Sequence, residues 1–439
     1  MSLYNIGKRV LYRGFPNKSS MPIRHYKVLS IETSCDDTCI ALLEKNDSKA
    51  PPKIIDQVKS TLNSVATGGI IPTDALRFHQ TTLASLIETL LKKHNCRPDL
   101  ICCTRGPGMA GSLSAGLQLS KGLAVAWGVP LIGVHHMLGH ILVATLPKSE
   151  QPDLTAPQYP FLSLLCSGGH TMLVLSKSIT DHEIIANTAD IAVGDSLDKC
   201  ARELGLKGVM LGRELESYVN SIKQSTIQKF DTMETKESNL NSFKYKLGLP
   251  LKGPRREKYP KDIVFAFAGF LSSIQSYKKD KGGLNVVLDQ ETREFISYKL
   301  QEHVFDHIID RMNLAFTKHG SNKRKYEHAD GKFLGVKDLI FSGGVASNQR
   351  LREKLATRLQ FQDNDGEVTD LNLHFPDLSL CTDNAVMIGV AGIEIFESLR
   401  IKSDLGVCPI PKWPMDSLLD VEGWVNVTPE EYNQVIQNK

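Results

Sequence analysis

Residues 27–44, KVLSIETSCDDTCIALLE, form an apolar segment, a polar turn and a second apolar segment. This alternation predicts a β-hairpin whose tip offers carboxylates and backbone amides. The same unit recurs at residues 161–175, FLSLLCSGGHTMLVL, where a Ser-Gly-Gly-His turn joins two apolar segments. Because one supersecondary unit is repeated, the sequence predicts two similar lobes that face each other across a cleft, with each hairpin tip directed into it.

The length of 439 residues is sufficient for two core-bearing domains. A composition of 41% apolar and 23% charged residues is typical of globular proteins. We expect a leader over residues 1–26, a first lobe over residues 27–157 and a second lobe over residues 158–439. Two polar segments, 217–262 and 318–332, predict insertions in the second lobe.

The net charge of +3 originates at the start of the chain, because residues 1–31 hold six basic residues and no acidic residue, so that the remainder carries −3. An acid-free segment with Arg, Lys and Ser but no apolar core is typical of an organellar transit peptide, and the alternative is a basic tail. No apolar run reaches the roughly 18 residues that a membrane span needs. The nine cysteines include no Cys-x-x-Cys pair, which favours reduced thiols.

The sequence VHHMLGH at residues 134–140 predicts a metal site. On a helix, His136 and His140 lie one above the other and direct two imidazoles at one point. Asp383, ahead of a long apolar segment, is a candidate for either the third ligand or a helix cap. The alternative for the histidines is burial with hydrogen bonds to the backbone. A zinc protease would need a glutamate at Met137.

Two glycine-rich turns follow apolar strands, at residues 105–108 (RGPG) and 342–344 (SGG). Glycine at such turns allows a ligand to approach the backbone closely, and a following helix favours a phosphate. Asp195 and Asp198 fall in the first turn of an expected helix, where an acidic residue can equally serve as a cap.

The segment from Lys244 to Lys261 is strongly basic, with Glu257 as its single acidic residue. Phe243, Tyr245 and Tyr259 are interleaved with the cations, as in nucleic-acid-binding surfaces. The alternative is a solvated surface loop.

Several of these motifs resemble, in their order along the chain, those of the tRNA N6-adenosine threonylcarbamoyltransferases, once described as O-sialoglycoprotein endopeptidases. The resemblance covers about residues 27–415, and the basic leader resembles the mitochondrial branch of the family. The motifs are residues 31–37, 105–108, 135–140, 167–171, 195–198, 342–345 with Asn348, and 381–384.

The resemblance implies an α/β fold with two tandem ribonuclease-H-like lobes and a central nucleotide cleft, as in actin, Hsp70 and sugar kinases. It implies one divalent ion per subunit, zinc, iron or magnesium, on His136, His140 and Asp383. At Leu211-Gly212-Arg213 the chain departs from the Gly-Gly-Pro of the family. The residues implied to hold threonylcarbamoyl-AMP, or ATP or AMP in its place, are Leu165, Cys166, Ser167, Gly168, Gly169, Asp198, Gly212 and Asn348.

The implied reaction passes the threonylcarbamoyl group to N6 of the adenosine 3′ of the anticodon, in tRNAs that read A-starting codons. The resemblance further implies action on the anticodon stem-loop in the mitochondrial matrix, away from membranes, by a homodimer supplied with threonylcarbamoyl-AMP by a separate synthase. We expect Asp36 or Asp37, at the first hairpin tip, to accept the amine proton, and the alternative role is organisation of water or phosphate. The rival functions are a metalloprotease, an ATPase or sugar kinase of the same fold, and a non-catalytic scaffold.

Overall fold

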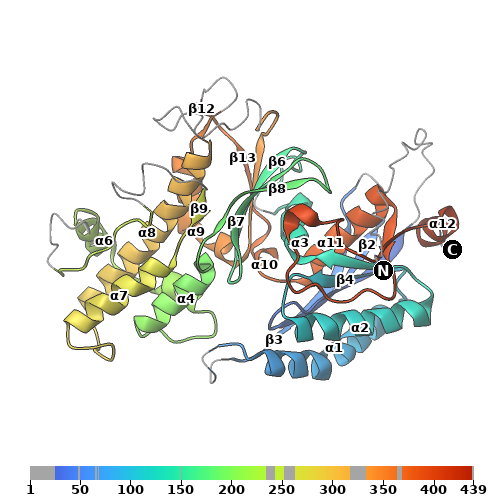
Figure 1. Ribbon diagram of the computed structural model, residues 1–439, viewed down its shortest axis with the longest axis horizontal. Helices are drawn as coiled ribbons and strands as arrows, with labels where there is room; N and C mark the ends of the chain where they lie inside the picture. Colours follow the sequence, from blue (N-terminus) through green and yellow to red (C-terminus); the bar gives the residue numbers. More distant parts are fainter. Residues whose placement is uncertain are drawn as a thin grey trace, which may run out of the picture.

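The computed structural model describes residues 25–47, 50–64, 67, 69–149, 151–233, 243–251, 263–316, 333–362 and 368–437. Two mixed β-sheets with helices packed on them make up this part of the chain (Figure 1). The expected insertion at 318–332, most of the expected leader, and residues 234–242 and 252–262 of the other insertion lie outside the described residues.

The first sheet has the strand order β3-β2-β1-β4-β5. β1 (Tyr26–Glu32) and β2 (Asp37–Lys45) form the first predicted hairpin, and β2 also pairs antiparallel with β3 (Lys53–Thr61). On the other side of β1, β4 (Leu100–Gly106) and β5 (Leu131–His135) continue the sheet in parallel. β4 and β5 are buried along their whole length, which explains why they are apolar on both faces.

The second sheet repeats this arrangement, with the order β13-β10-β6-β7-β8-β9. Its strands are β6 (Phe161–Cys166), β7 (Thr171–Ser176), β8 (His182–Thr188), β9 (Val264–Phe265), β10 (Asp338–Ser342) and β13 (Asn372–His374). As in the first sheet, the first strand of a three-strand antiparallel meander pairs in parallel with a later strand, here β10, which in turn pairs in parallel with a further strand, here β13. The predicted α/β fold of two ribonuclease-H-like lobes is therefore confirmed.

Helices cover both faces of the first sheet. α1 (Pro72–His94) and α2 (Ala110–Trp127) pack on one face, in a core that includes Leu29. α3 (His136–Leu142) and α11 (Ala385–Glu394) lie against the other face, and the C-terminal part of the chain thus returns to the first sheet. The boundary at residues 157/158 stays a prediction.

The helices of the second lobe are α4 (Val193–Glu203), α5 (Leu211–Asn220), α6 (Gln224–Asp231), α7 (Ala268–Asp280), α8 (Gln290–Phe316) and α9 (Gln349–Arg358) (Figure 1). The long helix α8 is buried along most of its length. Among the described residues, none of the helices is both long enough and apolar enough to cross a bilayer.

Short elements complete the described chain. They are η1 (Val143–Thr145), η2 (Gly344–Ser347), β11 (Phe361–Gln362), β12 (Val368–Thr369), α10 (Leu378–Cys381), η3 (Ile395–Leu399), β14 (Ile401–Ser403), η4 (Met415–Ser417), β15 (Trp424–Asn426) and α12 (Pro429–Gln437). η2 and α10 contact each other, which brings the turn after β10 next to the segment that precedes α11.

Candidate metal centre and nucleotide cleft

The sequence HHMLGH begins at the last residue of β5, His135, and continues as the helix α3. His136 is its first residue and His140 lies one turn later, so that both rings are on the same side of α3. Their centroids are 4.9 Å apart and the ring planes meet at 83°. Both side chains are buried, and α3 contacts β6 and β10 of the second lobe. The histidine pair therefore lies where the two lobes meet.

The neighbouring His135 shows the alternative role considered for the motif. Its Nε2 donates to the carbonyl of Trp413 at 2.9 Å, while its Nδ1 accepts from the backbone N–H of Met137 at 3.1 Å. Burial lowers the pKa of His135 to about 3, so this ring is neutral. His135 is thus a core histidine satisfied by the backbone, whereas the rings of His136 and His140 face Asp383.

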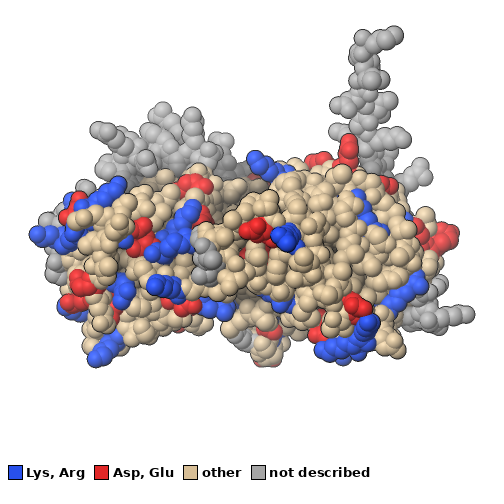
Figure 2. All heavy atoms as spheres, turned by 90° about the horizontal axis from the view of Figure 1, so that it is seen from below, with Lys and Arg blue, Asp and Glu red and all other residues tan. Residues whose placement is uncertain are grey.

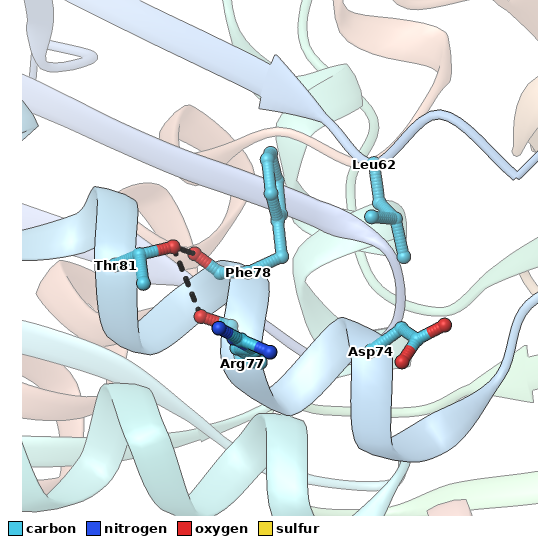
Figure 3. Close-up of a pocket in the computed structure, with 5 residues that line it drawn as sticks. All are labelled: Leu62, Asp74, Arg77, Phe78 and Thr81. Carbon is cyan, nitrogen blue, oxygen red and sulfur yellow. Dashed lines mark hydrogen bonds between the residues drawn. The ribbon is translucent and has the colours of Figure 1, made fainter.

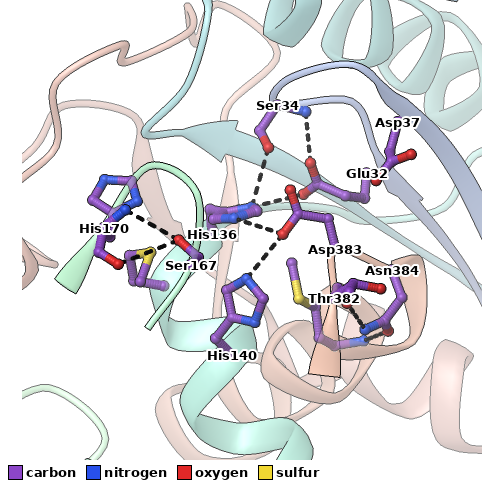
Figure 4. A network of polar contacts seen from close by, with 12 residues as sticks. Glu32, Ser34, Asp37, His136, His140, Ser167, His170, Thr382, Asp383 and Asn384 are labelled. Atoms are coloured by element: carbon purple, nitrogen blue, oxygen red, sulfur yellow. Dashed lines mark hydrogen bonds and ion pairs between the residues drawn. The ribbon is translucent and has the colours of Figure 1, made fainter. Parts of the chain in front are cut away.

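Asp383 lies in the turn before α11, where a cap and a metal ligand were equally consistent with the sequence. The neighbouring Asn384 is the cap, because its side chain accepts from the backbone N–H of Met387. The carboxylate of Asp383 is therefore free to face α3, and its Oδ1 lies 3.1 Å from His140 Nε2 and 3.5 Å from His136 Nε2 (Figure 4).

One ligand atom from each of His136, His140 and Asp383 lies within 4.8 Å of the other two, a spacing that fits a single metal ion. Two imidazoles and one carboxylate suit zinc or iron better than magnesium, which prefers oxygen ligands. The Asp383 side chain is 25% exposed, whereas those of His136 and His140 are 7% and 1% exposed. The centre is consequently open to solvent on the side of Asp383.

The charges at this centre favour a cation. Burial by itself disfavours charge on His136, but the Glu32 and Asp383 carboxylates outweigh burial and raise the pKa of His136 to about 10. Desolvation by itself would raise the pKa of Asp383, but the facing His136 and His140 hold this pKa well below the usual range. The pKa of Glu32 is lowered in the same way by His136, against the effect of burial. The two carboxylates thus stabilise positive charge where a divalent ion would bind.

The two candidate proton acceptors at the first hairpin tip differ in their surroundings. The Asp37 carboxylate pairs with Lys59 Nζ at 2.5 Å and accepts from the Thr61 hydroxyl at 2.5 Å. Burial nevertheless raises the pKa of Asp37 to about 6. Asp36 is half-buried, and its backbone carbonyl accepts from Leu62. Asp36 is the candidate for which the structure shows no ion pair among the described residues.

Lys59 connects the hairpin tip to the metal centre. Besides its ion pair with Asp37, it donates to the backbone carbonyl of Asp383 at 3.1 Å. The sequence did not single out Lys59, because its position in β3 became informative only once β3 was paired beside the hairpin.

The Ser167-Gly168-Gly169 turn joins β6 to β7 next to the first turn of α4. An added Cβ at Gly168 or Gly169 would meet no atom within 4 Å, so the turn offers its backbone to open space. The Gly194 amide donates to the Ser167 carbonyl at 3.2 Å, which places the N-terminus of α4 against the turn. Such a combination of turn amides and a helix N-terminus suits an anionic group. The remaining candidates of this strand, Leu165 and Cys166, have buried side chains.

Asp198 and Gly212 are in direct contact. The Gly212 amide donates to Asp198 Oδ1 at 2.6 Å, and burial raises the pKa of Asp198 above its usual value. Further along α5, Glu216 accepts from the backbone N–H of Gln349 at 3.0 Å. The preceding residue, Asn348, caps α9. α5 therefore links the Asp198 and Asn348 parts of the expected nucleotide site.

The two glycines of the Gly106-Pro107-Gly108 turn are packed against other segments of the chain. A Cβ on Gly106 would collide with the carbonyl of Ile410, and one on Gly108 with the backbone of Ser34. These glycines are required because other segments of the chain pack against the turn. The close approach at these two glycines is made by segments of the chain itself, and the approach of a ligand to this turn stays a prediction.

Phe243 and Tyr245 also differ from their expected role. Tyr245 is buried and its hydroxyl lies 2.9 Å from that of Ser273, while Phe243 stacks on Phe295 with centroids 4.5 Å apart. Both aromatics belong to the core of the second lobe. They are not available to stack on a nucleic acid, and Tyr259 lies outside the described residues.

A separate open pocket of about 320 Å³ lies beside the first hairpin (Figure 3). The Phe78 ring and Leu62 face each other across it. The backbone N–H of Leu62 donates a hydrogen bond to the Asp36 carbonyl. Its lining residues are Leu62, Asp74, Arg77, Phe78 and Thr81, so none of the expected site residues lines it.

Comparison with known proteins gives two sequence matches over most of the chain. The family model described as TsaD, tRNA N6-adenosine threonylcarbamoyltransferase, matches residues 53–390. A mitochondrial tRNA N6-adenosine threonylcarbamoyltransferase of Schizosaccharomyces pombe is 36% identical over 417 residues, which cover 93% of this chain and 91% of the relative.

Similar solved structures are more distant. A ROK family protein from Streptococcus pneumoniae has a TM-score of 0.38 and 9% identity, covering 85% of this chain and 99% of its own. A hexokinase has a TM-score of 0.36 and 11% identity, with 85% and 84% covered. The fold assignment rests on the strand order of the two sheets and not on these matches.

Proposed function

Because the chain belongs to the tRNA N6-adenosine threonylcarbamoyltransferase family, we propose that His136, His140 and Asp383 hold the divalent ion at which this tRNA-modifying transferase works. Membership of the family makes the chain an acyltransferase with tRNA as substrate, in place of the rival protease, kinase and scaffold functions. The observation that carries the metal proposal is the set of three ligand atoms within 4.8 Å of one another.

When bound, the ion would orient the threonylcarbamoyl group and stabilise negative charge that develops on its carbonyl oxygen. The chain itself would hold the adenylate through the Ser167–Gly169 turn and the N-terminus of α4, with Asp198, Gly212 and Asn348 around the nucleoside. The open space at Gly168 and Gly169 supports this assignment. We propose zinc or iron as the ion, since two of the three ligands are imidazoles.

For the amine proton of the tRNA adenosine, we propose Asp36 as the acceptor. Its carboxylate lies at the hairpin tip, and Asp37 is already engaged by Lys59 and Thr61. Asp37 and Lys59 would instead position Asp383, because Lys59 forms an ion pair with Asp37 and donates a hydrogen bond to the backbone carbonyl of Asp383.

Reconstitution tests the proposed site. The protein is incubated with threonine, bicarbonate, ATP, the adenylate-forming synthase and unmodified tRNA, and the tRNA is digested for nucleoside analysis. We expect N6-threonylcarbamoyladenosine with the wild type and a loss of metal and product with Asp383→Asn. The isosteric variant Asn384→Asp keeps the oxygen that caps α11 but loses the amide donations to Leu380 and Thr382; it serves as the control for local structure and should retain metal. Full metal content and product with Asp383→Asn would contradict the proposed site.

We further propose that the anticodon stem-loop is held by the basic stretch from Lys244 to Lys261. On the face drawn in Figure 2, Lys and Arg are interspersed with Asp and Glu among the described residues. Because tRNA is a polyanion that proteins bind largely through its phosphates, its binding surface needs a local concentration of cations. Lys244 and Lys246 are exposed, while the other cations of this stretch lie outside the described residues.

We also propose that the protein acts in the mitochondrial matrix, as a homodimer supplied by a separate synthase. The acid-free basic start of the chain supports the location, and the S. pombe relative is named as mitochondrial. Deletion of residues 1–25 should leave transfer in vitro unchanged but prevent import into isolated mitochondria. Light scattering of the full chain tests the dimer, and a monomer would contradict it.

A further inference from the structure

Glu32 is a buried acid at the end of a largely buried strand. It is the last residue of β1 and is 1% exposed. A carboxylate in such a position is costly unless its oxygens are paired, so its contacts define its role. Glu32 Oε1 accepts from the Ser34 amide at 2.6 Å, and Oε2 accepts from the Thr104 hydroxyl. Two neighbouring segments therefore fix the carboxylate.

The remaining contact of Glu32 is with the metal centre. Its Oε2 lies 3.1 Å from His136 Nδ1, while the other nitrogen of that ring, Nε2, faces Asp383. Figure 4 shows the His136 ring joined by dashed lines to both carboxylates. A metal-binding histidine commonly donates its second N–H to a carboxylate, which fixes the ring and its tautomer and increases the basicity of the ligand nitrogen.

We propose that Glu32 is a positioning residue that keeps the proton of His136 on Nδ1 and so presents Nε2 to the metal ion. This inference rests on the metal site of the proposed function. Ser34 Oγ is 3.2 Å from the same Nδ1 and is a weaker, neutral partner for it. Because Glu32 is held by Ser34 and Thr104, it cannot follow the ring, and the ring must instead adopt the orientation that Glu32 imposes.

The test measures metal affinity by chelator competition in Glu32→Gln and Glu32→Ala. We expect Glu32→Ala to weaken binding by about 10- to 100-fold, and Glu32→Gln to weaken it less, since an amide oxygen still accepts from Nδ1. Excess metal should restore transfer in both variants, with KM for the adenylate unchanged. Glu88→Gln makes the same change in an exposed ion pair on α1 and should bind metal as the wild type does.

A second measurement reads the tautomer directly. In ¹⁵N-histidine NMR of the zinc-loaded protein, His136 should keep its proton on Nδ1 in the wild type and lose this preference in Glu32→Ala. If both variants merely lower Tm and bind metal with wild-type affinity, Glu32 is only structural and the proposal is overturned. Glu32→Gln retains the side-chain volume and carries the test if Glu32→Ala does not fold. Loss of metal in Asp383→Asn, with wild-type binding in both Glu32 variants, would overturn this inference but leave the metal site intact.

Discussion

His140 Nε2 lies 3.1 Å from Asp383 Oδ1, although the two residues are 243 positions apart in the chain. The contact joins a helix that follows β5 to the turn that precedes α11, and it exists only because α11 packs beside α3. Asp383 does not cap α11, so its carboxylate contributes to the centre and not to the helix.

The first prediction therefore separates metal binding from stability. His136→Ala, His140→Ala and Asp383→Ala should each weaken metal binding by at least about 10- to 100-fold, because removal of a ligand costs at least as much as removal of the groups that support it. Transfer activity should fall with metal content, while Tm should change little for Asp383→Ala. Metal analysis after dialysis and thermal unfolding are the measurements. A variant with full metal and full activity would refute the ligand set.

The second prediction concerns the pH dependence of metal binding. The carboxylates of Glu32 and Asp383 outweigh burial and raise the pKa of His136 to about 10. A metal ion can occupy Nε2 only after the ring releases a proton, so affinity should rise by about tenfold per pH unit between about pH 6.5 and about pH 8.5. Calorimetry in two buffers of different ionisation enthalpy should show about one proton released per ion. An affinity that is flat over this range would contradict the prediction.

The third prediction concerns a buried lysine near the second sheet. Lys148 Nζ is 2.6 Å from His374 Nδ1, and His374 Nε2 donates to Asp338 at 2.8 Å. Burial lowers the pKa of Lys148 from 10.5 to about 8. Between these two values the unfolded chain binds a proton that the folded chain does not, so the free energy of unfolding should rise with pH relative to Lys148→Met. Below about pH 8 the difference between the two proteins should be constant. Urea unfolding at a series of pH values measures the free energy of unfolding of both proteins. A difference in this free energy that is independent of pH over the whole range would contradict the lowered pKa of Lys148.

The fourth prediction concerns tRNA. Charge reversal at Arg255, Arg256 and Lys258 should weaken tRNA binding and reduce the slope of log affinity against log salt by about 0.7–0.9 for each phosphate that is no longer neutralised. Binding of the adenylate should not change. Reversal of Lys92 and Lys93, which are exposed on α1, provides a control in which two cations are reversed outside the basic stretch. Wild-type tRNA affinity and salt slope in the triple variant would contradict the prediction, and residues 322–325 would then be the next candidates for the tRNA contact.

The site could be predicted from the sequence only where the signal is local. The four-residue spacing of His136 and His140 predicted that two rings share one helix side, and α3 confirms that geometry. Glu32 was not singled out from the sequence, because its partner His136 lies 104 positions further along the chain. The parallel pairing of β1 with β4 and of β4 with β5 is what brings Glu32 beside the start of α3.

From the sequence alone, the repeated strand–turn–strand unit determined the two-lobed α/β fold, because strand alternation and turn chemistry act over a few residues. The tertiary structure decided between alternative roles of a residue that are equally consistent with the local sequence pattern. It made Asn384 the cap and left Asp383 to face the histidines, and it placed Phe243 and Tyr245 in the core. The physical reason is that capping and burial depend on which surface a segment meets, and that surface is supplied by residues far away in the chain.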